Sequence, residues 1–98
     1  MRAREIAEEL VAASAAYAEA VLNSGDDDAE TLIALTRAAE REQMTLAALI
    51  ETRATSADDI VAKTEAYGRL KADETWPGLC ASLLSSIGRD AAAMARAA

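Results

Sequence analysis

Three short stretches of helix-breaking residues interrupt a chain that otherwise consists of strong helix formers. They are Asn-Ser-Gly-Asp-Asp-Asp at 23–28, Ala-Thr-Ser-Ala-Asp-Asp at 54–59 and Glu-Thr-Trp-Pro-Gly at 74–78. Ala, Leu, Glu and Arg dominate the segments between them, and these residues favour helix. No alternating strand pattern is present in the sequence. We therefore expect a single all-α domain over 1–98, with helices at about 2–23, 28–53, 57–73 and 77–96.

Each break also carries the chemistry of helix ends. Glycine suits the left-handed position after a helix. Ser, Thr and Asp accept from the first backbone N–H groups, and proline fits the first turn. The candidates, in chain order, are Gly25 and Asp27, then Thr55 or Ser56 with Asp58 or Asp59 three residues later, then Thr75 or Trp76 before Pro77. The stretch 51–70 is therefore predicted to be a capped turn between two helices rather than a site.

Apolar residues recur at spacings of three and four in each expected helix, which is the period of a helix with one buried face. The four stripes are Ile6, Leu10, Ala13, Tyr17 and Val21; Leu32, Leu35, Ala39, Leu46 and Leu49; Ile60, Val61, Thr64, Tyr67 and Leu70; Trp76, Leu79, Cys80, Leu83, Leu84, Ile87 and Met94. Short connections favour antiparallel helical hairpins in a three- to four-helix bundle. Within the third helix, the acid-before-base pairs Asp59–Lys63 and Glu65–Arg69 are expected to support the helix locally, as ion pairs on its surface do.

The chain has little large apolar surface to bury, because 26 of its 98 residues are alanine. A small core gives a small hydrophobic stabilisation, so association with a second copy is attractive. The second helix also carries apolar residues outside its stripe, at Ile33, Met44 and Ile50. We therefore expect a homodimer. Its predicted interface is Leu32, Leu35, Ala39, Leu46, Ile50, Leu83 and Ile87.

The charge of the chain is acidic and uneven. The formal net charge is −7, most of it in the first 30 residues, and the basic residues are spread singly. Proteins that bind nucleic acid normally present a basic face, so no direct nucleic-acid partner is expected. The acidic half suggests an alternative function, an inhibitor from a phage or mobile element that blocks a nucleic-acid-processing complex, as anti-CRISPR proteins and DNA mimics do. It would face a basic protein surface with Glu5, Glu8, Glu9, Asp26, Asp27 and Asp28.

Several kinds of chemistry are disfavoured by the residue types. The sequence has no histidine, which removes the usual general base and the commonest transition-metal ligand. The single cysteine, Cys80, lies on an apolar stripe and is predicted to be a buried thiol in a reducing compartment. The acids at 26–28 lack the spacing of an EF-hand loop, and the N-terminal glutamates lack the Glu-x-x-His of a di-metal bundle. We expect no catalytic residue, metal or cofactor.

No apolar run approaches the length of a membrane span, and the N-terminus does not have the pattern of a signal or transit peptide. A cytoplasmic location and no membrane partner are therefore expected.

A set of small, capping and apolar residues lies between 49 and 90: Ala54, Thr55, Ser56, Ile60, Lys63, Trp76, Leu79, Leu83 and Leu84. In this pattern the segment resembles a group of small helical proteins from α-proteobacteria whose function is unassigned. The resemblance implies a bacterial genome, or a mobile element within one, and brings no catalytic residue with it.

The leading hypothesis is a non-enzymatic helical module for protein–protein interaction or self-association. Two further alternatives stay open. An enzyme that uses only carboxylates would need acids from two helices in one concave cluster. A helix-turn-helix regulator would need a basic face that this sequence does not show.

Overall fold

The computed structural model describes residues 2–23 and 29–97, and within them the chain forms four helices. These are α1 (Ala3–Leu22), α2 (Ala29–Glu51), α3 (Ala57–Ala72) and α4 (Pro77–Ala97). The predicted all-α architecture is confirmed, and every helix end lies within two residues of its predicted position. The expected cap at Gly25 and Asp27 falls outside the described residues.

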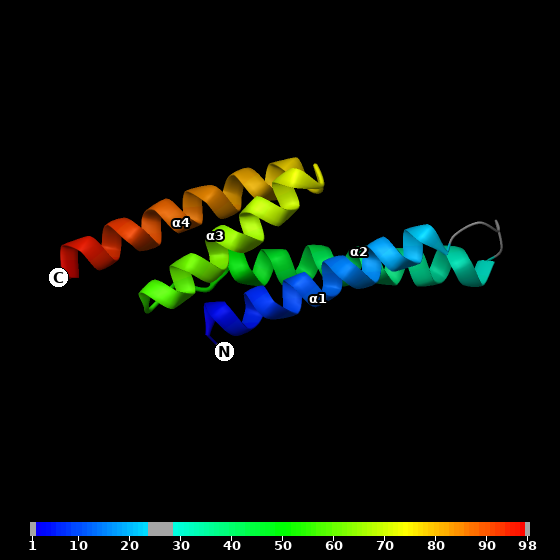
Figure 1. Cartoon of the computed structure of the whole chain (residues 1–98), viewed down its shortest axis with the longest axis horizontal. Helices are drawn as coiled ribbons and strands as arrows, with labels where there is room; N and C mark the ends of the chain where they lie inside the picture. The colour runs from blue at the N-terminus through cyan, green and yellow to red at the C-terminus, as the bar shows by residue number, and fades with distance from the viewer. Residues whose placement is uncertain (1, 24–28, 98) are drawn as a thin grey trace.

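The helices form two antiparallel hairpins that overlap only in part. α1 contacts α2 and α3, and α4 contacts α2 and α3, so the four helices surround a common core. Figure 1 shows the α1–α2 hairpin extending beyond the other pair at one end, while the C-terminal end of α4 extends at the opposite end. The molecule is consequently long and thin, with extents of 55 × 23 × 16 Å.

The apolar core lies where the two hairpins overlap. It is built from Ile6, Leu10, Leu46, Leu49, Leu70 and Leu83 with the smaller Ala3, Ala7, Ala66 and Cys80. Burial ends at Ala13 in α1 and begins only at Glu42 in α2. Residues 14–22 and 29–41 therefore pair with each other and lie mostly beyond the second hairpin, although Ser14, Ala15 and Ala18 share a hollow with the end of α3. We call these two segments the free hairpin.

The buried face of α3 differs from the predicted stripe. Asp59, Lys63, Ala66 and Leu70 are buried, whereas Val61 and Thr64 of the predicted stripe are exposed. The prediction assumed that charged side chains face solvent. Asp59 and Lys63 are instead buried, because polar groups in the interior pair with them. The helix is therefore rotated relative to the predicted orientation.

The turn between α3 and α4 is set by backbone hydrogen bonds. The N–H of Thr75 donates to the carbonyl of Leu70 at 3.1 Å, and the N–H of Glu74 donates to that of Lys71 at 3.1 Å. This pair of bonds is the Schellman motif, and it places Glu74 in the left-handed region at φ 54°. Pro77 opens α4 as predicted.

Replacing Glu74 by glycine should stabilise the protein. An L-residue pays about 1–2 kcal/mol in the left-handed region, and glycine does not, although it adds freedom to the unfolded chain. We expect a net gain of about 0.5–1 kcal/mol in urea-induced unfolding. The control is Glu65→Gly in the exposed interior of α3, which should cost about 1 kcal/mol. Equal losses for the two variants would contradict the role of the turn.

Candidate functional site

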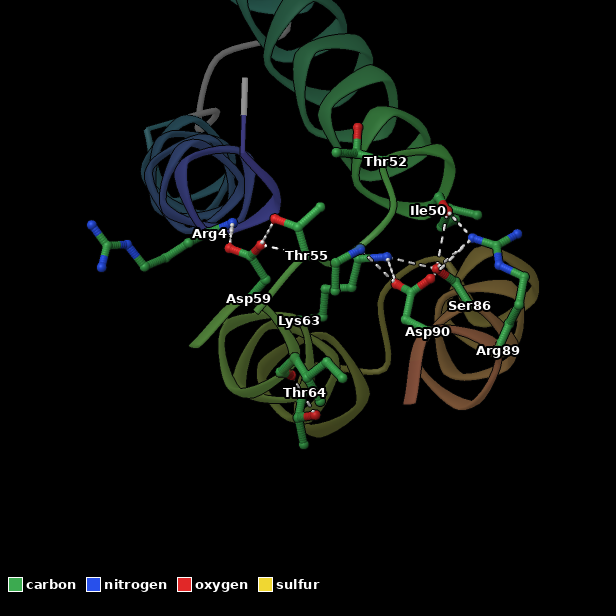
Figure 2. A network of polar contacts seen from close by, with 12 residues as sticks. Arg4, Ile50, Thr52, Thr55, Asp59, Lys63, Thr64, Ser86, Arg89 and Asp90 are labelled. Carbon is green, nitrogen blue, oxygen red and sulfur yellow. Dashed lines mark hydrogen bonds and ion pairs between the residues drawn. The ribbon is translucent and has the colours of Figure 1, made fainter. Parts of the chain in front are cut away.

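Three ionisable side chains, those of Asp59, Lys63 and Asp90, are completely buried, and Ser86 is nearly so. Burial of a charge is costly unless it is paired and hydrogen-bonded, so such a group is the first place to look for function. Figure 2 shows that they lie where the start of α1, the end of α2, the start of α3 and the middle of α4 converge. We call these four residues the polar network.

Asp59 joins α3 to the start of α1. Its Oδ1 accepts from the backbone N–H of Arg4 at 3.2 Å, and its Oδ2 accepts from the N–H and the hydroxyl of Thr55, both at 3.0 Å. The first N–H groups of a helix have no partner within it. The residue at the cap position of α1, Arg2, makes no side-chain cap. A carboxylate from another helix therefore caps α1 and complements the positive end of its dipole.

Lys63 and Asp90 join α3 to α4. Lys63 Nζ lies 2.6 Å from Asp90 Oδ2 and donates to Ser86 Oγ at 2.8 Å. The same Asp90 oxygen accepts from the backbone N–H of Ala54 at 3.1 Å. The predicted surface pair between Asp59 and Lys63 is therefore wrong, because each of the two binds a group from a different helix.

The network also terminates α2. The Ser86 hydroxyl donates to the carbonyl of Ile50 at 3.0 Å, and Arg89 Nη2 donates to the same oxygen at 3.4 Å. The last carbonyls of a helix lack intrahelical partners, and α2 ends at Glu51. Side chains from α4 thus satisfy the end of α2, as a side chain from α3 satisfies the start of α1 (Figure 2).

A lysine that donates to a serine hydroxyl is also the arrangement of a Ser-Lys nucleophile pair. Here Lys63 is ion-paired with Asp90, and Ser86 directs its proton to the Ile50 carbonyl. Four hollows on the described surface are each lined by other residues. Ser86 is nearly buried and its hydroxyl is bonded to the end of α2, so in this fold the network positions neighbouring segments of the chain.

Ser56 is the observed cap of α3, because its Oγ accepts from the N–H of Asp59 at 3.2 Å. Of the two predicted caps at this turn, the hydroxyl of Ser56 is therefore confirmed. The other, Thr55, instead donates to Asp59. The stretch 51–70 is a structural junction in this fold.

A second buried carboxylate lies nearer the α3–α4 turn. Glu42 is 1 % exposed, and its Oε1 accepts from the indole N–H of Trp76 at 3.0 Å. Among the described residues, no donor reaches its Oε2. Desolvation by burial raises the pKa of Glu42 despite the bond from Trp76, which acts in the opposite direction. Burial likewise raises the pKa of the free Cys80 thiol, whose predicted burial is confirmed.

The pKa values of the two carboxylates in the polar network are shifted in the opposite direction, downward. The pKa of Asp59 is lowered, first of all by the backbone N–H of Thr55, and further by its hydroxyl and the N–H of Arg4. For Asp90, burial alone would raise the pKa. The hydrogen bonds from Lys63 and from the N–H of Ala54 outweigh that effect and lower it. Both groups are thus held as carboxylates at neutral pH.

The residues of the predicted dimer interface are divided between interior and surface. Leu46 and Leu83 are fully buried in the chain's own core, and Ile50 and Ile87 pack against it. Leu35 and Ala39 are half-buried, and Leu32 is exposed. A single chain does not test an interface, so dimerisation stays a prediction.

The predicted acidic surface is placed only in part. Glu5, Glu8 and Glu9 are exposed on α1, with Glu8 lying 3.8 Å from Arg4, while residues 26–28 fall outside the described part. Among the described residues, no cluster of three or more metal-ligating side chains is found. Within the same residues, no helix combines the length and apolarity needed to cross a membrane.

Sequence reasoning missed the burial of Glu42, Lys63 and Asp90, yet a signal was present. Each continues the period of an apolar stripe: Glu42 lies four residues before Leu46, and Asp90 lies seven after Leu83. A charged residue on such a stripe marks either a break in the buried face or a buried polar contact. The second reading holds for all three.

Comparison with known protein families, curated proteins and solved structures finds no match to this chain. The resemblance to α-proteobacterial proteins therefore stays a prediction. The residues that carry it include Ala54, Thr55, Ser56, Lys63 and Trp76, and all five make the tertiary or capping contacts described above.

Removing one member of the Lys63–Asp90 pair should be strongly destabilising. Lys63→Met leaves a buried carboxylate without its cation, which typically costs about 3–5 kcal/mol. Asp90→Asn still offers an oxygen to the N–H of Ala54 but leaves the ammonium unpaired. The double variant removes both charges and should be more stable than Lys63→Met alone.

Urea unfolding of the four proteins measures the coupling between the two sites. The control is Lys71→Met, which changes an exposed lysine on the same helix whose ammonium lies 5.9 Å from the centre of the Tyr67 ring. Loss of this exposed cation–π contact should cost at most about 1 kcal/mol. If the stability lost in the double variant equals the sum of the losses in the two single variants, the two side chains act independently.

The buried carboxylates predict a stability maximum at mildly acidic pH. Because the pKa of Glu42 is raised in the fold, its contribution improves as pH falls from neutrality toward the ordinary glutamate value of about 4.3. Because the pKa values of Asp59 and Asp90 are lowered, both carboxylates still contribute to stability at mildly acidic pH. These contributions are lost only below about pH 4.

In Glu42→Gln the amide oxygen can still accept from Trp76, but nothing titrates at this position. We expect this variant to lose the gain in stability that follows acidification from neutrality, and to keep the loss of stability below about pH 4. Chemical denaturation from neutral pH down to about pH 3 measures both. An unchanged profile in the variant would rule out Glu42 as the source of the gain.

Proposed function

We propose that this protein is a non-enzymatic helical module that self-associates through the α1–α2 hairpin, in a reducing compartment such as the cytoplasm. The observation that carries the proposal is the position of the exposed apolar side chains. Leu22, Leu32, Ile33 and Met44 are at least half exposed, and all four belong to this hairpin. Leu22 and Met44 are 84 % and 73 % exposed, respectively.

The shape of the fold supports the same surface. The second hairpin covers only one half of α1 and α2, so residues 14–22 and 29–41 present apolar groups that the chain does not cover. A helix that is apolar on two faces needs two neighbours. Several large exposed apolar side chains on one part of a protein are typical of interaction sites.

The polar groups support an interaction role rather than catalysis. The buried charges bind backbone N–H groups or each other, and the Ser86 hydroxyl donates to a backbone carbonyl. The free thiol of Cys80 is buried. These features favour a scaffold over an enzyme and are compatible with a reducing environment.

The test is the mass of the full chain in solution between about 1 µM and about 1 mM, measured by sedimentation equilibrium. The wild type should approach twice its 10.3 kDa mass at the upper end. The variant Leu32→Glu with Ile33→Glu should remain monomeric, because it places carboxylates in the apolar surface. Thermal unfolding of each variant verifies that it is folded.

A matched control is available on the other hairpin. Val61 and Leu84 are exposed to a similar degree on α3 and α4, so Val61→Glu with Leu84→Glu adds the same charge elsewhere. This control should associate like the wild type. A wild type that stays monomeric throughout the range would refute self-association, and equal loss in both variants would refute its location on the α1–α2 hairpin.

A further inference from the structure

The outward face of α2 carries a short stripe with an unusual order of side chains. Ile33, Arg37, Glu40 and Met44 follow one another at spacings of four, three and four, so they share one side of the helix. At 3.6 residues per turn, this stripe lies about 180° from the buried positions of α2 such as Leu46. All four side chains are exposed. We call them the outer stripe.

The order of side chains in the outer stripe allows it to pair with an antiparallel copy of itself. Along the chain its order is apolar, basic, acidic, apolar. A second copy laid antiparallel, with the two-fold axis between Ala38 and Ala39, brings Ile33 opposite Met44 of that copy. The same placement brings Arg37 opposite Glu40. Because the axis is two-fold, each of these pairs occurs twice, as an isologous interface requires.

The neighbouring positions permit the approach. About two and a half turns out from the axis, the same side of the helix carries Ala29 and Ala48, which this pairing also brings opposite each other. Small side chains at both ends let two helices lie close over about 30 Å of length. A shallow hollow beside the stripe, lined by Leu32, Ile33 and Thr36 among others, offers space for a side chain from the other copy.

We propose that two copies of this chain pair antiparallel through the outer stripe of α2, with the two-fold axis between Ala38 and Ala39. The inference rests on the proposed self-association and specifies its surface and register. The apolar pairs supply the attraction, and the Arg37–Glu40 pairs set the register, since exposed ion pairs contribute more to specificity than to affinity. One helix pair buries a small area, so the dimer is weak and reversible.

Charge exchange tests the ion pairs. In a dimer of Arg37→Glu, each of the two ion pairs is replaced by two facing glutamates. In a dimer of Glu40→Arg, each is replaced by two facing arginines. Each variant should dimerise roughly tenfold more weakly than the wild type. A mixture of the two variants restores both attractive pairs and should form a heterodimer close to wild-type affinity, as should the double variant Arg37→Glu with Glu40→Arg with itself.

Matched controls are Arg53→Glu and Glu65→Arg, which make the same changes in net charge at exposed positions off the stripe. Neither should change the affinity by more than about twofold.

Cysteine cross-linking tests the register directly, in a Cys80→Ala background. Ile33→Cys mixed with Met44→Cys should form an intermolecular disulfide on oxidation, because these positions face each other. Ile33→Cys alone should not, since its two copies are displaced by roughly 16 Å along the helices, beyond the reach of a disulfide.

The outcomes separate the two proposals. A wild type that stays monomeric overturns self-association and this register together. A wild type that dimerises, with no restoration in the charge-exchanged mixture or with Ile33→Cys cross-linking to itself, overturns only the antiparallel pairing.

Discussion

The fold depends on buried carboxylates that accept from backbone N–H groups outside their own helices. Asp59 of α3 accepts from the N–H of Arg4 in α1, and Asp90 of α4 accepts from the N–H of Ala54 after α2. A chain with few large apolar side chains gains little from specific packing, and an alanine-rich helix can slide along its neighbour at small cost. Polar contacts to helix ends resist such sliding, because one residue of displacement would leave buried groups unpaired. The network therefore fixes the relative positions of helices that the apolar core alone holds loosely.

These contacts also couple the helices into one folding unit. The bonded residues are 55 apart for Arg4 and Asp59, 36 for Ala54 and Asp90, and 27 for Lys63 and Asp90. Lys63 and Asp90 lie within the α3–α4 hairpin, whereas Asp59 reaches Arg4, and Asp90 reaches Ala54, only when the two hairpins are packed together. A partly assembled bundle would bury some of the charges without their partners, so such intermediates are disfavoured and the bundle forms as a whole.

Much of the architecture follows from local sequence, whereas the polar network does not. The helices, the cap at Ser56 and the start of α4 at Pro77 were predictable because they depend on residues within a few positions of each other. The partner of Lys63 was not, because the nearest acid at helical spacing is Asp59, and the choice of Asp90 depends on where α4 lies. The same reason explains the rotated face of α3, where a charged residue takes the buried position and Val61 the exposed one. On the functional side, the apolar excess of α2 was visible in Ile33 and Met44. Which of its apolar residues the chain covers itself became clear only from the placement of α3 and α4.

The partial overlap of the two hairpins has a consequence for local motion. Amide protons in the overlap are protected by four helices and by the polar network, and their exchange with solvent requires the whole bundle to open. Toward the ends that join α1 to α2, in the segments 19–22 and 29–41, no buried residue is found among the described ones, so a local separation there exposes the backbone without disturbing the core. Hydrogen exchange in a single chain should thus be graded along the long axis, slow in the overlap and fast toward the end of the free hairpin. Any partner that covers this hairpin would be recorded first as a slowing of that exchange.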